Sequence, residues 1–379
     1  MNIQRVKRFA LGAVVIAGLV GSAIVFAGAG GEEHDDGENG ESFTVALWGD
    51  MPYIKSAVVW TSEQQVANLI ADVNKQKVTF SVFDGDIKSG SSYCDDSQYS
   101  QAIARFNSLK APAVYVPGDN EWTDCHRKNN AAAAPGYNAL ERLTYIRQTM
   151  FNTVFSFGQK TMKLEHQGLP GQPYSENTRW TRGGVIFVGL NVPGSNNNLI
   201  HASECLGSKS YRTQADCDAD NAEYAARDAK NLQWIKESFE LARSKKAPGI
   251  MFVLQADMGF DLPETETVNE GAFATSAADI AARAKAGYDG FDKTVTELRN
   301  QSLNFSGQVV LVHGDTHSFK VDKPLITPDS PAAGPFHVVT NFTRVETFGE
   351  SNADWVRLTV NLKSRNVFNF EPMIVAANH

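Results

Sequence analysis

Short apolar runs alternate with amphipathic stretches from residue 43 onward. Three runs rich in β-branched and aromatic residues, 43–50, 78–86 and 113–119, have the length and composition of buried strands. The stretches between them, 61–77 and 97–110, place apolar residues on one helical face, and Thr61-Ser62 gives the first a capping start. This order of strands and helices predicts a parallel sheet with helical crossovers.

The second half of the chain follows a looser pattern. We expect a helix within 126–148, a strand within 180–194, a polar loop over 195–222, a helix over 228–246 and strands over 249–257 and 308–317, the last two separated by a helical insert. The tail alternates polar and apolar residues as antiparallel strands do. Because no internal repeat and no further boundary is visible, residues 43–379 are predicted to form one large α/β domain.

The residues before this domain have a different composition. A basic start, an apolar run over 9–27 and small residues at 27–29 are typical of a secretory signal peptide, residues 1–29. The apolar run is also just long enough to span a bilayer, so an uncleaved anchor is the alternative. Residues 30–42 are acidic and lack large apolar side chains, which predicts a flexible linker. Either alternative predicts an exported chain that is periplasmic, secreted or anchored to the outer side of the membrane.

Composition excludes several classes of protein. The chain has 379 residues, of which 42% are hydrophobic and 21% charged, so it is not predicted to be disordered or coiled coil. It carries 35 Lys and Arg against 43 Asp and Glu, and no window gathers enough cations for a phosphate-tracking nucleic-acid patch. Four cysteines in an exported chain suggest disulfides. Four cysteines can pair in three ways. Because Cys205 and Cys217 lie close together in the sequence, we expect them to pair with each other and Cys94 to pair with Cys125.

The candidate chemistry lies at the strand ends. Three strands run into Gly-Asp, at Asp50, Asp86 and Asp119, and a fourth is followed by Asp315 and His317. In an open α/β sheet ligands bind outside the carboxyl ends of the strands, so these side chains should converge. Converging carboxylates repel one another unless a cation holds them. The sequence therefore predicts a metal site.

These segments resemble the motifs of the calcineurin-like metallophosphoesterases. That family carries, in order, D-x-H, G-D, G-N-H-D/E, a lone His and G-H-x-H. The corresponding segments lie at 49–53, 85–90, 118–122, 254–259 and 314–319, and order and spacing agree over roughly 43–320. The resemblance implies a two-layer β-sandwich flanked by helices (a four-layer α-β-β-α fold) and a dinuclear metal site, at which a metal-bound hydroxide attacks phosphorus.

The chain departs from the family at several ligand positions. Pro52 replaces the histidine of the first motif, Asp119 an asparagine ligand, Gln255 the lone histidine and Asp315 the first histidine of the last motif. With the matching positions, the resemblance implies the metal ligands Asp50, Asp86, Asp119, Gln255, Asp315 and His317. Such an oxygen-rich set favours one or two Mn²⁺ or Mg²⁺ ions, with Ca²⁺, Fe or Zn²⁺ as alternatives.

Proton donation is the weakest part of the predicted site. Asn120 stands where the family has a proton-donating histidine, and it can only orient a phosphate oxygen through its amide. If Cys94 pairs with Cys125, His126 and Arg127 are held at the rim of the site. His126 is then a candidate proton donor and Arg127 a candidate phosphate ligand. The alternative is that both are ordinary exposed loop residues.

The sequence thus predicts an exported metal-dependent phosphoester hydrolase, a metallophosphoesterase acting on a small-molecule or head-group phosphoester. The alternative is a non-catalytic metal- or ligand-binding protein on the same fold, which the lost histidines favour. Contact with a membrane is expected only if the N-terminal segment stays uncleaved.

Overall fold

The structure, a computed structural model, describes residues 42–55, 58–130, 135–260, 277–327 and 337–379. The predicted signal peptide and all but the last residue of the predicted linker therefore lie outside the described residues. No helix in these described ranges is both long enough and apolar enough to cross a bilayer. The elements below all fall in one compact unit, Gly40–His379.

The first sheet contains the three strands predicted from the N-terminal half. Its order is β14-β13-β1-β4-β5, and β1 is parallel to β4 and β4 to β5, which confirms the predicted parallel core. The last two strands pair antiparallel at its other edge, as the alternating tail predicts. The bounds are β1 Ser42–Trp48, β4 Phe80–Phe83, β5 Ala113–Tyr115, β13 Trp355–Asn361 and β14 Phe368–Met373.

The second sheet differs from the prediction in two places. Its order is β11-β12-β10-β9-β8-β7-β6. Residues 180–194 were expected to hold one strand, but β7 and β8 form a hairpin turned by Gly183 and Gly184, both at positive φ. In the tail, β12 pairs parallel to β10, so the expectation of only antiparallel strands there is wrong. The bounds are β6 Glu165–His166, β7 Thr178–Arg182, β8 Val185–Gly189, β9 Gly249–Val253, β10 Gln308–His313, β11 Lys320–Asp322 and β12 Phe342–Glu346. A separate small hairpin pairs β2 Tyr53–Lys55 with β3 Val58–Thr61.

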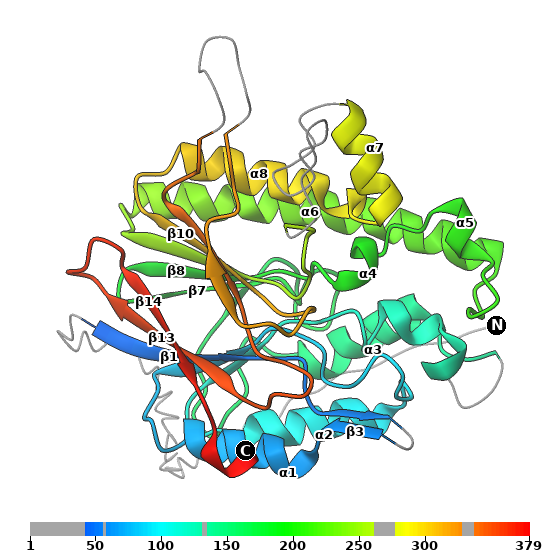
Figure 1. Cartoon of the computed structure of the whole chain (residues 1–379), viewed down its shortest axis with the longest axis horizontal. Coiled ribbons are helices and arrows are strands. Elements are labelled where there is room, and N and C mark those ends of the chain that lie inside the picture. The colour runs from blue at the N-terminus through cyan, green and yellow to red at the C-terminus, as the bar shows by residue number, and fades with distance from the viewer. Residues whose placement is uncertain (1–41, 56–57, 131–134, 261–276, 328–336) are drawn as a thin grey trace, which may run out of the picture. The chain divides into compact units, whose positions relative to one another are not determined.

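Helices cover the outer face of each sheet. Figure 1 shows α6 and α8 over the second sheet and α1 and α2 over the first. Helix α1 begins with a capping box between Ser62 and Gln65, close to the predicted start. Helix α6 begins at Gln214, inside the predicted polar loop, and α3 begins at Ala139, well after residue 126. The bounds are α1 Glu63–Val73, α2 Asp96–Asn107, α3 Ala139–Met150, α4 Gly194–Asn197, α5 Ala202–Cys205, α6 Gln214–Ser244, α7 Ala277–Ala286 and α8 Asp292–Leu303.

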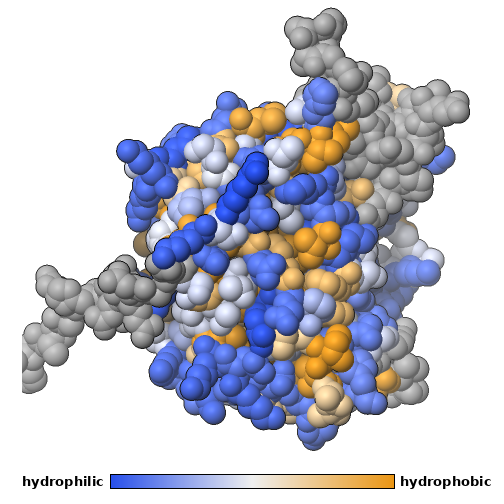
Figure 2. Space-filling model, turned by 60° about the vertical axis from the view of Figure 1, so that its left-hand side comes forward, coloured by the Kyte–Doolittle hydropathy of each residue, from blue (hydrophilic) through white to orange (hydrophobic). Residues whose placement is uncertain are grey.

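Apolar side chains fill the space between the layers. One cluster of buried residues joins the inner faces of the two sheets, where the rings of Phe80 and Phe187 lie 5.1 Å apart and those of Trp180 and Phe187 are stacked. Two further clusters lie between each sheet and its helices. Each large apolar side chain buried in this way contributes about 1.5–3 kcal/mol to stability. The chain is thus α/β with two mixed sheets flanked by helices, as predicted. On the face in Figure 2 hydrophilic residues predominate around separate apolar patches.

Both predicted disulfides are present. Cys94 pairs with Cys125 and Cys205 with Cys217. The first ties the segment after β4 to the segment after β5, so it links two of the predicted metal-ligand loops. The second joins the short helix α5 to the first turns of α6.

Replacing both Cys94 and Cys125 with Ser is expected to lower the free energy of unfolding by about 3–4 kcal/mol, because the unfolded chain regains the freedom of a loop with a sequence separation of 31. For Cys205 and Cys217, separated by 12, the expected loss is about 3 kcal/mol. Urea denaturation of both double variants measures the two losses. If the shorter loop proves the more stabilising, the loop-length argument does not hold for this chain.

Candidate metal centre

The predicted acids meet at the carboxyl ends of the central strands. A cavity of about 320 Å³ opens there, and its lining includes Asp86, Asp119, Asp315, His317 and Asn120. Asp50 lies directly behind it, fully buried, with Oδ1 3.3 Å from Nε2 of His317. The convergence of four acids and one histidine from four strand ends, inferred from the sequence alone, is what the folded chain contains.

Four of these residues have a strained backbone. Asp50, Asp86, Asp315 and His317 have φ of 52°, 63°, 74° and 65°. A left-handed conformation costs an L-residue of this kind roughly 1–2 kcal/mol. Strain of this sort persists where the surrounding structure enforces it, and it concentrates at functional sites. Of these four residues, Asp86, Asp315 and His317 line the cavity, and Asp50 lies behind it in contact with His317.

The glycines beside the acids have a specific structural role. A Cβ on Gly314 would lie 1.9 Å from Oδ2 of Asp50, and one on Gly118 would lie 2.1 Å from Oδ1 of Asp86. On Gly194 it would lie 2.9 Å from oxygens of both Asp119 and Asp315. Each of these glycines therefore makes room for the carboxylate of another motif. The repeated Gly-Asp is a packing requirement of converging acids, as well as turn chemistry.

Tyr53 and Asn120 bind the central acid of the site. The Tyr53 hydroxyl donates to Oδ2 of Asp86 over 2.6 Å, and Nδ2 of Asn120 lies 2.7 Å from the same hydroxyl. The backbone N–H of Asn120 donates to Oδ1 of Asp86 over 3.0 Å. Asn120 is thus placed in the site, as predicted, with its amide directed at Asp86. Tyr53 directly follows Pro52, the position at which the first motif lacks its histidine.

The electrostatics of the site favour a cation. Burial, reinforced by the charge of Asp119, raises the pKa of both Asp86 and Asp315 well above the usual range. Burial alone would lower the pKa of His317, but its hydrogen bond to Asp50 and the charge of that acid raise the pKa overall. A divalent cation would relieve this repulsion, and a mainly carboxylate set suits Mg²⁺ or Mn²⁺.

In the structure the carboxylate oxygens of the site accept hydrogen bonds from other groups of the protein. Oδ2 of Asp119 accepts from the Ser195 hydroxyl over 2.7 Å, and Oδ2 of Asp315 accepts from the backbone N–H of Asp257 over 3.0 Å. Consistent with this, no three His, Cys, Asp or Glu side chains of the described residues are grouped closely enough to hold an ion as they stand. The donor types fit a hard divalent ion, and binding one requires some of these hydrogen bonds to be exchanged.

Gln255 lies beside the acids and supports them. It is fully buried, and its Nε2 donates to Oδ1 of Asp119 over 3.3 Å. Its Oε1 accepts from the backbone N–H of Gly194 over 2.5 Å, so the oxygen predicted to bind metal is already engaged. In this arrangement Gln255 orients Asp119 and closes the back of the site.

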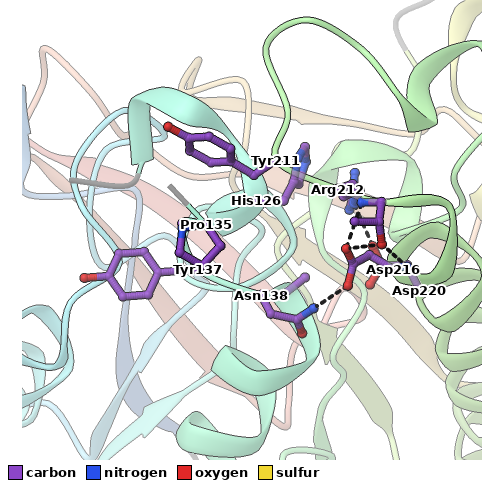
Figure 3. A pocket seen from close by; sticks show the side chains of 11 residues that line it. His126, Pro135, Tyr137, Asn138, Tyr211, Arg212, Asp216 and Asp220 are labelled. Carbon is purple, nitrogen blue, oxygen red and sulfur yellow. Dashed lines mark hydrogen bonds and ion pairs between the residues drawn. The ribbon is translucent and has the colours of Figure 1, made fainter. Parts of the chain in front are cut away.

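Arg127 and His126, both predicted at the rim of the site, line two different cavities. Arg127 lines the cavity, forms an ion pair with Asp124 and donates to the Ser195 hydroxyl over 3.1 Å. Its side chain is 40% exposed, which suits a phosphate ligand at the entrance. His126 instead lines a different cavity of about 200 Å³, between the amino ends of α3 and α6, where Nδ1 lies 2.8 Å from the Ser210 hydroxyl (Figure 3).

The interpretation of His126 as a proton donor is therefore wrong on two counts. The short 3₁₀ turn Thr123–His126 directs its ring away from the acids. Burial, together with the positive charges of Arg212 and Arg127, lowers its pKa to about 3, so it carries no proton to donate at neutral pH.

Sequence reasoning missed a left-handed turn that completes the site. Ser195, Asn196, Asn197 and Asn198 all have positive φ, between 48° and 62°. Hydrogen bonds from the buried Arg227 to the backbone and side-chain oxygens of Asn197 fix the turn. It places the Ser195 hydroxyl 2.7 Å from Asp119 and 2.8 Å from Asp124. The signal was the run Gly-Ser-Asn-Asn-Asn, since Asn and Gly tolerate this conformation best.

Two further acids were also missed. Glu121 is fully buried, and its Oε1 accepts from the backbone N–H groups of Gly118 and Asp86 and from the Tyr115 hydroxyl. It thereby joins the loops that follow β4 and β5. Asp124 holds Arg127 and Ser195, as described above. Both lie within six residues of Asp119, but their contacts depend on partners distant in sequence.

Comparison with known proteins gives matches among solved structures alone: no protein-family model and no curated protein matches the chain. Purple acid phosphatase from yellow lupin (Lupinus luteus) seeds is similar at TM-score 0.43 and 11% identity, over 89% of this chain and 52% of that one. A dimetal phosphatase from Danio rerio is similar at TM-score 0.41 and 10% identity, over 88% and 99%. A 5'-nucleotidase from Candida albicans gives 0.40 and 10%, over 88% and 51%.

The chain thus spans about half the length of the lupin and Candida proteins. By name, two of these proteins are phosphatases and one is a nucleotidase. Because every TM-score is below 0.5, the assignment of the site rests on the chain's own residues.

Gly314→Ala is expected to lower the free energy of unfolding by about 1–3 kcal/mol, because the new methyl group would overlap the buried Asp50 carboxylate. Gly207→Ala is the matched control, since its Cβ would meet no atom closer than 3.4 Å and should change stability by about 0.5 kcal/mol or less. Thermal and urea unfolding compare the two. Equal stability of both variants would contradict the proposed role of the glycine.

His126→Gln is expected to make stability less dependent on pH. The imidazole has a pKa of about 3 in the folded chain and near 6.5 when unfolded, so the unfolded state binds more protons between these values. Stability from this group is therefore complete above pH 6.5 and is lost as pH falls. From pH 7 to pH 5 the wild type should lose about 2 kcal/mol more than the variant. Urea unfolding at pH 5, 6 and 7 measures this, and parallel pH curves would contradict it.

Proposed function

We propose that the chain is an exported metal-dependent phosphoester hydrolase. The observation that carries the proposal is the convergence of Asp50, Asp86, Asp119, Asp315 and His317 on one small cavity, four of them at positive φ. A structure without a ligand for these acids would gain stability by losing them. The apolar run at 9–27 and the two disulfides support export.

In this proposal the acids and His317 hold one or two divalent ions, Mn²⁺ or Mg²⁺ before others because oxygen donors predominate. Such an ion lowers the pKa of a coordinated water and polarises a phosphoryl oxygen. The remaining chemistry belongs to the chain. Arg127 at the entrance would bind a substrate oxygen through its guanidinium, and Asn120 would orient another through its amide.

The cavity restricts the proposed substrate in two ways. Its volume of about 320 Å³ is at the lower end of ligand sites, which suits a phosphate with a small substituent or an exposed head group. Asn120 carries no acidic proton and His126 lines a different cavity, so neither residue considered for this role can protonate a leaving group here. Hydrolysis is therefore expected to favour esters of acidic alcohols or phenols, which leave without a proton.

A second candidate function is metal or ligand binding without catalysis. It is favoured by the hydrogen bonds that now occupy the carboxylate oxygens and by the loss of the proton-donating histidine. This reading predicts bound metal but no turnover. The enzyme is preferred because Arg127 and Asn120 face the same cavity as the acids, an arrangement that metal binding alone does not require.

Asp86→Asn is the most direct test of the proposed hydrolase. We expect it to lower the metal-dependent hydrolysis of a chromogenic phosphoester by about 100-fold or more, because Asp86 is the central acid of the site. Elemental analysis of the same preparations should show less bound metal. Asp218→Asn is the matched control: it makes the same chemical change at an exposed position of α6 and should leave both readouts unchanged.

The outcomes separate the two functions. Turnover and metal that both depend on Asp86 support the hydrolase. Metal that depends on Asp86 without turnover of any phosphomonoester or phosphodiester between pH 5 and pH 10 supports the binding protein. If the Asp86→Asn variant and the wild type are alike in both readouts, the proposed site is wrong.

A further inference from the structure

The second feature of the molecule that calls for a ligand is a basic groove at the other end of the strands. Its volume is about 1090 Å³, and it lies where the chain enters β4, β5 and β8. Its lining contains five cations and neither an acidic nor an aromatic residue. The basic groove is defined by the cations Lys75, Lys77, Lys110, Lys160 and Arg182.

The positive charges of the basic groove contrast with the net negative charge of the whole protein. The whole protein has a net charge of −8, yet five cations gather here. None of the five forms an ion pair with another described residue. The four lysines are exposed and Arg182 is half-buried. Like charges gathered in this way repel one another, so an anion in the groove would lower their mutual energy.

The loops that carry the cations are held together, so the groove is built and not a chance meeting of surface chains. Oδ1 of Asn74 accepts from the backbone N–H of Lys110 over 2.7 Å, and its Nδ2 donates to the carbonyl of Ser108 over 3.1 Å. The backbone N–H of Lys160 donates to the carbonyl of Lys110 over 3.3 Å. Three separate segments of sequence are thereby fixed around one groove, and Arg182 at the end of β7 completes the lining. The floor is formed partly by Val73, Val78, Ala111 and Pro112.

The composition of the lining narrows the class of anion. A concave groove accepts an extended chain better than the flat surface of a bilayer. Without an aromatic side chain it offers no surface on which bases could stack, so single-stranded nucleic acid is disfavoured. Four of the five cations are lysines, which bind phosphate as point charges and need no bidentate geometry.

We propose that the basic groove binds a linear polymer of phosphate groups that lacks bases. Through it the protein would hold a phosphate-bearing polymer at the end of the strands opposite the acidic cavity. Binding itself needs neither a metal nor turnover, so it can be tested whether or not the proposed hydrolysis is correct.

The test uses the chain from residue 30 onward, which contains every described element, and inorganic polyphosphate as the probe. The variant Lys75→Gln/Lys160→Gln removes two charges that different segments contribute to the groove. We expect it to weaken binding at least 10-fold at moderate salt and to reduce the slope of log affinity against log salt by about 1–2. The control Lys209→Gln/Lys230→Gln removes the same charge from exposed positions outside the groove and should change affinity less than 2-fold.

Further arms decide the ligand class. Poly-glutamate of matched length and vesicles containing anionic lipid are compared with polyphosphate at the same ionic strength. Tighter binding of polyphosphate, lost in the groove variant alone, supports the proposal. Tighter binding of poly-glutamate or of vesicles, or equal weakening by the control variant, overturns it. Hydrolysis of a small chromogenic ester should be the same in both variants, so a failed groove and a failed active site give different results.

Discussion

Burial of several carboxylates at one sheet edge is the constraint on which the rest of the site depends. Asp50 and Asp86 are almost completely removed from water, and Asp119 and Asp315 face the same cavity. Desolvating such charges costs several kcal/mol each unless they are paired, hydrogen-bonded or protonated. Hydroxyl and amide donors offset part of this cost, whereas the close approach that the glycines allow and the backbone strain at four positions add to it. These unfavourable local features are concentrated in one place, where a bound cation would offset the repulsion between the acids.

The N-terminal half of the fold was predictable because its signals are local. Strands β1, β4 and β5 are short apolar runs, and the helices between them carry a continuous apolar face and, in α1, a capping box. The errors lie where pairing is not encoded locally. Nothing in the sequence of β12 distinguishes a strand parallel to β10 from one antiparallel to it. The first half of α6 buries charged residues such as Asp220 and Arg227 beside Cys217 and Tyr224, so it shows no clear apolar face from which a helix could be predicted.

The site residues show the same difference between local and long-range signals. The acids were found because each follows a strand, and the carboxyl ends of parallel strands meet at one edge. Ser195 was missed because its role depends on a contact across 76 residues, and the bond from Tyr53 to Asp86, across 33 residues, has no local signal either. His126 was misplaced for a related reason. The disulfide fixes the backbone of Cys125, but the sequence does not say to which side the next side chain, that of His126, will point. In the structure His126 points toward Ser210.

The distribution of charge connects the two ends of the molecule. The carboxyl ends of the strands carry a surplus of acids, while the basic groove at their amino ends gathers cations from four segments that no sequence window brings together. An acidic cavity repels a free phosphate ester until a cation is bound, and it gives substrates little long-range attraction. A basic groove on the same rigid unit would supply that attraction for a polymeric substrate, because holding one part of a polymer raises the local concentration of the rest. Chemistry and capture would then be separated by the length of the strands, with each end keeping the charge that its own task requires.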